Sequence, residues 1–419
     1  MQGLSLEGAV CAGCGCLCDD IGIEIREGTP VRLHRACPMG EAWIRSLRPP
    51  GVEALVGGRS AGTGAALDAA QSLLGEAFSP AIAGLSGLTL EAIVEAARLG
   101  EGIHAPLVPF PVPPAGLRRS GIDAPECSAT LGEVRGTADV VVFWRADPLR
   151  THPRHLERFT LEPPLIDGRK RVIVLVDDPG AGSETAPRAN LCLTLESSPD
   201  FPAADLDCVR SLRLLLEKGE SEGEDGTRRA AAVALARRLE GASHVHFVLG
   251  HEAAASPALW NAFQLLAARS RRARRVTVGA LPGPGNWRGV LEVLSWRTGG
   301  LEPAMDLVPL LEAGAADLLL AAGLDTAELP ARARRAYEGL RRIVIGPEPD
   351  PAAAVSIRVP GLDPRLAASV VRSDGIHLTL DGRGPSGRGM PDPAAAFLAE
   401  LTARSAPGAA LHTTFGRAR

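Results

Sequence analysis

The stretch ADVVVFWRADP, residues 138–148, decides the fold class. An apolar run followed at once by charged residues and a proline predicts a short strand buried on both faces, with a polar loop at its carboxyl end. The same plan recurs in KRVIVLVDDPG (170–180), ASHVHFVLGHEAA (242–254), RRVTVGALPGPGN (274–286), ADLLLAAGLD (316–325) and RRIVIGPEPD (341–350). Strands of this kind are typical of parallel sheets.

Amphipathic stretches lie between these strands, and they predict an α/β protein whose parallel sheets are flanked by helices. A chain of 419 residues is long enough for two or three domains. We expect a small cysteine-rich subdomain, one α/β domain built from two separate parts of the chain, and a Rossmann-like α/β domain between those parts. The predicted bounds are 1–48 for the subdomain, 49–132 and 299–400 for the two-part domain, 133–298 for the Rossmann-like domain, and 401–419 for a tail.

Composition excludes several classes of partner. The net charge of -4, with 22% charged and 45% hydrophobic residues, gives no reason to expect binding to nucleic acid or to an anionic membrane. We find no apolar run near the roughly 18 residues that a membrane span needs, and no signal peptide in MQGLSLEGAV. These features predict a cytoplasmic protein.

Five loops follow the predicted strands, where parallel sheets bind their ligands: 84–91, 144–155, 176–182, 249–253 and 281–289. None has the spacing of a known phosphate-binding fingerprint, so ordinary turns of an α/β protein are the favoured interpretation. In RTHPRH, the side chains of His152, Arg154 and His155 form either a catalytic or phosphate-binding cluster or a structural loop. Asp177 and Asp178 either bind a ribose hydroxyl or cap the next element.

The first 37 residues hold five of the eight cysteines. VCAGCGCLCDD (10–20) places Cys11, Cys14 and Cys18 at C-x2-C-x3-C spacing, and the hairpin around EGTP is expected to return Cys37 to this loop. Four thiolates from two segments favour a [4Fe–4S] cluster, with Cys16 as a spare that points away. The alternatives are a structural zinc site and a cysteine motif that no longer binds a metal. Disulfides are not expected, because thiols stay reduced in the cytoplasm. The isolated Cys127, Cys192 and Cys208 are expected to be small buried residues.

Several linked motifs resemble one family. CAGCGCLCDDI with RACPMGEAWI, LGEVRGTADVVVFWRADPLRTHPRHLERF, PGNWRGVLEVLSWRTGG and RSDGI are similar to segments of the B subunit of formylmethanofuran dehydrogenase, a molybdopterin oxidoreductase. The likeness runs, with gaps, from Cys11 to about Gly382. It implies one [4Fe–4S] cluster on Cys11, Cys14, Cys18 and Cys37. In this family, a molybdenum or tungsten ion is also bound by two pterin guanine dinucleotides.

One departure from the family changes the expected function. The metal of the dehydrogenase is held by a cysteine or selenocysteine in a turn that here reads GLSGLTLEA, and Leu90 stands at the ligand position. A leucine has no lone pair for a metal. We therefore expect molybdenum and tungsten to be absent, and no catalytic residues in this chain. Whether the molybdopterin guanine dinucleotide is still bound is left open by the sequence.

The resemblance then implies the B subunit of a bacterial formyltransferase/hydrolase complex in one-carbon metabolism. Its expected partners are the transferase and hydrolase subunits, with a methanofuran-type carrier as a further partner. The alternatives are an active molybdenum or tungsten formylmethanofuran dehydrogenase subunit and an iron–sulfur electron-transfer module.

Overall fold

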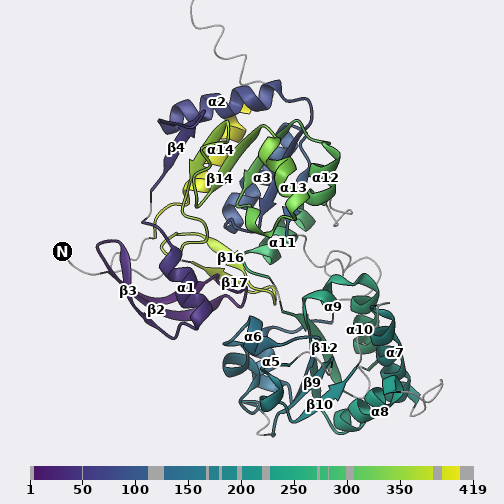
Figure 1. Cartoon of the computed structure of the whole chain (residues 1–419). Helices are drawn as coiled ribbons and strands as arrows, with labels where there is room; N and C mark the ends of the chain where they lie inside the picture. Colours follow the sequence, from purple (N-terminus) through teal and green to yellow (C-terminus); the bar gives the residue numbers. More distant parts are fainter. Residues whose placement is uncertain are drawn as a thin grey trace, which may run out of the picture.

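The computed structural model describes residues 4–49, 51–111, 127–166, 169–178, 182–195, 201–218, 227–270, 274–281, 283–298, 306–380 and 389–405. Two parallel sheets with helices on both faces form most of the molecule, and a small antiparallel sheet lies beside them (Figure 1). The predicted fold class, an α/β protein with a small cysteine-rich unit at its N-terminus, is confirmed.

The cysteine-rich unit is an antiparallel sheet with one helix. Its elements are β1 (Leu4–Cys11), β2 (Cys18–Arg26), β3 (Thr29–His34) and α1 (Pro38–Ser46). The predicted turn at EGTP is confirmed: Glu27 and Gly28 have positive φ angles of 51° and 78° and connect β2 to β3.

The larger sheet has strand order β5-β4-β15-β14-β13-β6-β7. Its five parallel strands are β6 (Pro80–Leu85), β7 (Leu107–Phe110), β13 (Leu318–Ala322), β14 (Arg342–Gly346) and β15 (Val355–Arg358). β4 (Glu53–Val56) and β5 (Arg59–Ala61) add an antiparallel edge. Numbered along the chain, the parallel strands follow the order 2-1-3-4-5, a doubly wound order whose switch point lies between the first and third strands, β6 and β13.

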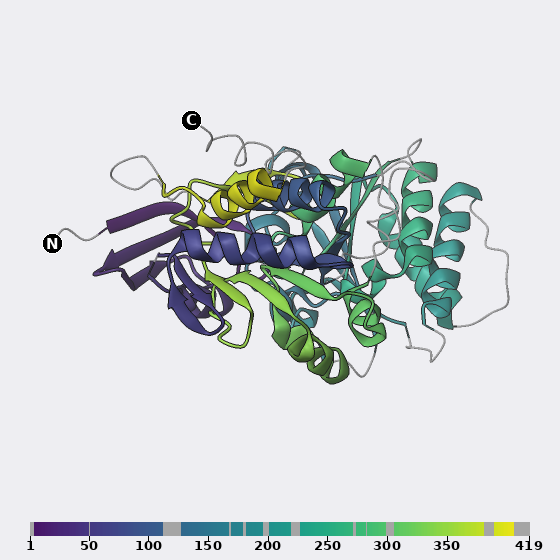
Figure 2. The ribbon, with the colours of Figure 1, turned by 90° about the horizontal axis from the view of Figure 1, so that it is seen from above.

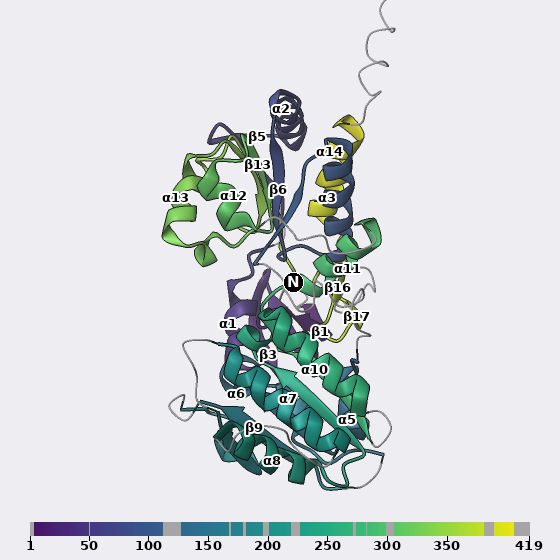
Figure 3. The same cartoon turned by 90° about the vertical axis from the view of Figure 1, so that its right-hand side faces the viewer.

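Helices cover both faces of this sheet (Figure 3). One face carries α2 (Thr63–Glu76), α3 (Leu90–Gly102) and α14 (Pro393–Ser405), and the other carries α12 (Leu307–Ala313) and α13 (Ala331–Gly339). Figure 2 shows α2 and α14 side by side, although they come from distant parts of the chain.

The second sheet has strand order β10-β9-β8-β11-β12 and is parallel throughout. Its strands are β8 (Val140–Trp144), β9 (Val172–Asp177), β10 (Leu191–Thr194), β11 (His244–Leu249) and β12 (Arg275–Ala280). The order 3-2-1-4-5 along the chain is that of a Rossmann-type sheet. All five residues of β8, which lies within the apolar run at 138–148, are buried because the strand is central and covered on both faces.

Helices α7 (Ala203–Lys218), α8 (Thr227–Leu239) and α10 (Pro257–Ser270) pack on one face of this sheet, and α5 (Leu131–Thr137) with the π-helical turn η1 (Leu156–Thr160) packs on the other. The remaining elements are α6 (Pro148–Thr151), η2 (Ala186–Arg188), α9 (His251–Ala255), α11 (Trp287–Thr298), η3 (Thr326–Glu328), β16 (Ser369–Val371) and β17 (His377–Thr379). None of the helices in the described ranges is long and apolar enough to cross a membrane.

Candidate functional site

The cysteine loop connects β1 to β2 and forms the closed end of their hairpin. Cys11 and Cys18 are register partners there, and Gly15 and Leu17 take positive φ angles of 75° and 44° to close the turn. Cys11, Cys14 and Cys18 are buried, and so is Cys16. Three of the four predicted ligands therefore lie in the core of the small subdomain.

The fourth predicted ligand, Cys37, is the N-cap of α1, and its sulfur accepts a hydrogen bond of 3.4 Å from the Gly40 backbone N–H. A Cβ on Gly40 would lie 3.0 Å from the Cys11 sulfur and 3.7 Å from the Cys37 sulfur. Glycine at this position therefore lets α1 approach the loop, and the predicted return of Cys37 to Cys11 is confirmed.

The thiols differ in how readily they ionise. Burial raises the pKa of Cys11 to about 12, and the neighbouring thiols of Cys18, Cys14 and Cys37 add to this rise. A hydrogen bond from Cys16 lowers the pKa of Cys14 to about 7. Cys16 thus contacts Cys14 instead of pointing away, so the prediction of its orientation was wrong. Cys127 and Cys208 are buried as predicted, whereas Cys192 is exposed.

The donor set suits a cluster better than a single ion. Across the residues that the structure describes, no three His, Cys, Asp or Glu side chains converge on a point where one metal ion could bind. Zinc requires such convergence, whereas a [4Fe–4S] cluster spreads its four thiolates over separate iron atoms. Four grouped thiols and the glycine cradle at Gly40 fit the cluster.

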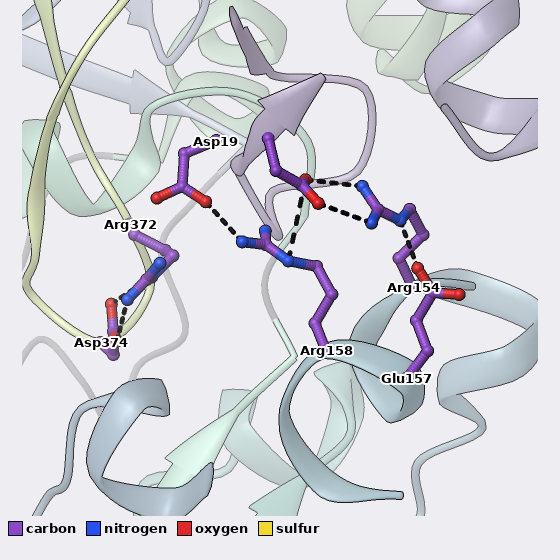
Figure 4. A network of polar contacts seen from close by, with 7 residues as sticks. Asp19, Arg154, Glu157, Arg158, Arg372 and Asp374 are labelled. Carbon is purple, nitrogen blue, oxygen red and sulfur yellow. Dashed lines mark hydrogen bonds and ion pairs between the residues drawn. The ribbon is translucent and has the colours of Figure 1, made fainter. Parts of the chain in front are cut away.

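Ion pairs connect the cysteine loop to the Rossmann-type sheet (Figure 4). Arg154 binds Asp20 through two hydrogen bonds of 2.7 and 2.8 Å, and Arg158 binds Asp19. The two aspartates directly follow Cys18, and the two arginines belong to the RTHPRH loop and to η1. Arg154 is thus committed to an ion pair, which supports the structural interpretation of this loop over a phosphate-binding one.

The two histidines of the loop are also buried in protein. The ring of His155 packs edge-on against Phe143 and Phe159, at centroid distances of 5.8 and 5.7 Å. Burial is the main cause that lowers the pKa of His155 to about 3, which keeps the ring neutral. Asp177 accepts a hydrogen bond of 2.9 Å from the backbone N–H of Asp178, its neighbour in the chain.

The turn that corresponds to the family's metal-binding turn is occupied by contacts within the protein. Leu90 is the first residue of α3 and is only 9% exposed, packed in the core of the larger sheet. The Thr89 hydroxyl donates to Asp392 and accepts from the Ala92 backbone N–H, and Ser86 donates to the carbonyl of Phe110 over 2.9 Å. The carboxylate of Glu91, the next residue, accepts a hydrogen bond of 2.8 Å from the Ser369 backbone N–H.

A cleft of about 710 Å³ lies at the carboxyl ends of β6, β13, β14 and β15, next to the cysteine loop. Of the five predicted loops, 84–91 and 281–289 contribute to its lining. Further lining segments follow β13, β14 and β15, and others come from the cysteine-rich subdomain, including Gly13 and Trp43; sequence reasoning missed them. Ligands of parallel sheets bind beyond the carboxyl ends of the strands. The same expectation, applied to the strands in ADLLLAAGLD and RRIVIGPEPD, would have found two of these segments.

Acidic side chains dominate this cleft. Its lining includes five carboxylates and two guanidinium groups: Asp325, Glu328, Glu348, Asp350 and Asp363 against Arg48 and Arg358. Both arginines are engaged, because Arg48 pairs with Glu348 at 2.6 Å and Arg358 pairs with Glu53 at 2.9 Å. Three of the carboxylates are paired as well: Glu348 with Arg48, Asp350 with Arg342 at 2.8 Å, and Asp363 with Arg365 at 2.5 Å.

Comparison with known proteins agrees with this architecture. No protein-family model matches the chain. The chain is 29% identical over 222 residues to the B subunit of tungsten-containing formylmethanofuran dehydrogenase 2 from Methanocaldococcus jannaschii, covering 50% of this chain and 49% of the relative. The same subunit from Methanococcus maripaludis is 29% identical over 229 residues, covering 51% of each. The chain thus spans about half the length of these relatives.

A solved structure extends the likeness in fold. It is the formyltransferase/hydrolase complex from Methylorubrum extorquens with methylofuran, and one of its chains matches with a TM-score of 0.65 and 23% identity, over 84% of this chain and 98% of that chain. The resemblance to the B subunit of formylmethanofuran dehydrogenase is thereby confirmed, and the fold is that of a chain in the formyltransferase/hydrolase complex.

Proposed function

We propose that this chain is the B subunit of a cytoplasmic formyltransferase/hydrolase complex in one-carbon metabolism, and that it carries out no redox chemistry. The observation that carries the proposal is Leu90, which is buried in the core where the family holds its metal. A fold that covers 98% of a chain from such a complex supports it. The expected partners are transferase and hydrolase subunits, with a methanofuran-type carrier.

A pterin guanine dinucleotide carries a diphosphate, which needs positive charge or free donors at its site. Both guanidinium groups of the cleft lining are already engaged by carboxylates, Arg48 by Glu348 and Arg358 by Glu53. We infer that the chain holds neither this cofactor nor molybdenum or tungsten.

The main rival function is an active dehydrogenase subunit, which the tungsten-containing relatives favour. Co-expression of the full chain with the transferase and hydrolase subunits of the same organism separates the two. We expect a stable hetero-oligomer by size-exclusion chromatography with light scattering, since permanent interfaces commonly bury more than about 2,000 Å². The chain alone should neither transfer nor hydrolyse formyl groups.

Metal analysis and a dye-reduction assay on the same preparation test the rival function, the active dehydrogenase. The complex is expected to contain no molybdenum or tungsten and to reduce no viologen dye with the formylated carrier. Near-stoichiometric tungsten together with dye reduction would favour the dehydrogenase. A monomer that stays separate from both partner subunits would contradict the proposed assembly.

We also propose that Cys11, Cys14, Cys18 and Cys37 hold one [4Fe–4S] cluster, as their spacing predicts. Anaerobically purified protein is expected to be brown and to contain about four iron atoms per chain. Cys14→Ser should abolish the colour, whereas Cys192→Ser, an exposed cysteine on β10, should leave it unchanged. Colourless protein, or one zinc per chain, would contradict this assignment.

A further inference from the structure

A second and much smaller cavity lies in the Rossmann-type domain and shares no described lining residue with the cleft. Its volume is about 40 Å³, and its walls include the carboxyl-terminal halves of β11 and β12, part of α10, the start of α11 and the loop after β16. His155, His246, Trp260 and Ser373 are among its polar lining residues. The proposed function makes no use of this cavity.

A chain of hydrogen bonds runs from α5 to this cavity and fixes the positions of its protons. It begins at Thr137, whose hydroxyl donates to the Glu133 carbonyl over 2.9 Å, because a carbonyl can only accept. That hydroxyl has one proton, so its contact of 2.8 Å with Nδ1 of His244 makes the histidine ring the donor. A neutral ring that donates at Nδ1 accepts at Nε2.

Thr277 extends the chain to His246. Its hydroxyl lies 2.8 Å from Nε2 of His244 and 2.9 Å from Nδ1 of His246. Because it donates its proton to His244, it accepts from His246, so Nδ1 of His246 carries a proton. Both rings are buried, and burial lowers the pKa of His244 to about 4 and that of His246 well below its usual range, so both are neutral at pH 7. Nε2 of His246 therefore has a lone pair and no proton.

This lone pair lies at the wall of the cavity. A Cβ added to Gly279, another lining residue, would lie 3.1 Å from Nε2 of His246, so glycine leaves this atom uncovered. Among the described residues, none donates a hydrogen bond to it. Two more ring nitrogens of lining residues, Nδ1 of His155 and Nε1 of Trp260, are buried without a partner in the described part of the chain. Buried polar atoms are normally paired with protein or with ordered water, so a polar occupant is expected here.

We propose that this cavity is a binding site for small neutral molecules with an O–H or N–H donor, which donate a hydrogen bond to Nε2 of His246. A water molecule needs roughly 10–15 Å³ of such space, so about 40 Å³ admits about three waters or one molecule of the size of formamide. An anion such as formate has no proton to donate and should bind less well. The inference depends neither on the cluster nor on the partner subunits.

Nitrogen NMR of the full chain, labelled in its histidine rings, tests the positions of the protons. We expect His244 and His246 to be protonated at Nδ1 and unprotonated at Nε2. Thr277→Val assigns the two signals, because the Thr277 hydroxyl contacts both rings. A His246 ring that is protonated at Nε2 in the unmodified chain would overturn the proposal.

Titration of the same signals with formamide and with sodium formate tests the chemistry of the occupant. We expect saturable shifts of the His246 signal with formamide and weaker binding of formate. In Thr277→Val nothing holds the proton on Nδ1, and formamide should bind about fivefold less tightly, the loss of about one neutral hydrogen bond. Thr277→Ser keeps the hydroxyl and should restore the affinity.

A pair of glycine variants tests the place of binding. Gly279→Ala puts a methyl group against Nε2 of His246 and should weaken formamide binding. Gly64→Ala on α2, where a Cβ meets open space, should bind formamide like the unmodified chain. Equal affinities in the unmodified chain, Thr277→Val and Gly279→Ala would contradict the assignment, and so would tighter binding of formate than of formamide.

A crystal structure of the unmodified chain separates the two kinds of occupant. Ordered water within about 2.7–3.2 Å of Nε2 of His246, with no response to formamide in solution, would identify water as the occupant. Replacement of that water in crystals soaked with formamide, together with the saturable shifts, would identify a site for a small organic molecule. A cavity with no occupant beside Nε2 would overturn the proposal.

Discussion

Replacing Asp205 with alanine is expected to lower the free energy of unfolding by about 3–5 kcal/mol, because it removes the carboxylate that pairs with a buried arginine. Asp205 is 1% exposed and pairs with Arg145, which is 8% exposed, at 3.0 Å. It also accepts a hydrogen bond of 2.7 Å from the indole N–H of Trp144. This carboxylate connects the carboxyl end of β8 to the first turn of α7, and the alanine variant loses that connection.

Chemical denaturation of the full chain measures this effect. Asp207→Ala, at an exposed position on the same helix, is the control and should change the unfolding free energy by less than about 0.5 kcal/mol. Asp205→Asn keeps an acceptor for Trp144 and should recover part of the loss. A destabilisation below about 1 kcal/mol for Asp205→Ala would show that the pair contributes little.

The second large expected effect is a loss of stability in mild acid. Burial lowers the pKa of His155 from 6.5 to about 3 and that of His244 from 6.5 to about 4, and it lowers the pKa of His246 well below its usual range. In each case the folded state holds the neutral ring. Between pH 6.5 and these lower values, the unfolded chain binds more protons than the folded chain.

Stability must therefore fall as the pH drops through that window, and the histidine contribution is fully present above pH 6.5. One unit of pKa shift is worth about 1.4 kcal/mol, so these rings together amount to several kcal/mol. Unfolding free energies measured from pH 7 to pH 4 should fall steeply. In His155→Phe the unfolding free energy should fall less steeply with pH, because phenylalanine binds no proton. The new ring should be accommodated, since the ring of His155 already packs against Phe143 and Phe159.

His377→Phe provides the matched control, because His377 is exposed on β17 beside Glu292. We expect the acid sensitivity of this variant to match that of the unmodified chain. The same pH slope for His155→Phe and the unmodified chain would show that His155 is not among the groups that couple proton binding to unfolding.

Local patterns were enough to predict the strands and the cysteine hairpin. The run at 138–148 became β8, and 170–180 became β9, because continuous apolar runs of this length can be buried only between two layers of helices. The EGTP turn could be predicted because glycine supplies the positive φ that it requires. Sequence spacing alone also indicated which four cysteines form the candidate site.

The roles of single polar residues could not be predicted in this way. Arg154 looked like a candidate for phosphate binding, yet its partner is Asp20, 134 residues away along the chain. The cleft was only partly predicted because its walls come from strands that are distant in sequence. Which loops meet at one edge of a sheet depends on strand order, which hydrophobic periodicity does not encode.

By itself the sequence determined the fold class, the cysteine hairpin and the absence of a metal ligand at Leu90, since each depends on residue types at short spacing. Tertiary structure alone decided that Leu90 is buried in the core, which segments line the cleft, and that Arg154 pairs with Asp20. These features depend on long-range packing, where burial and charge pairing are set by segments that meet only in the folded chain.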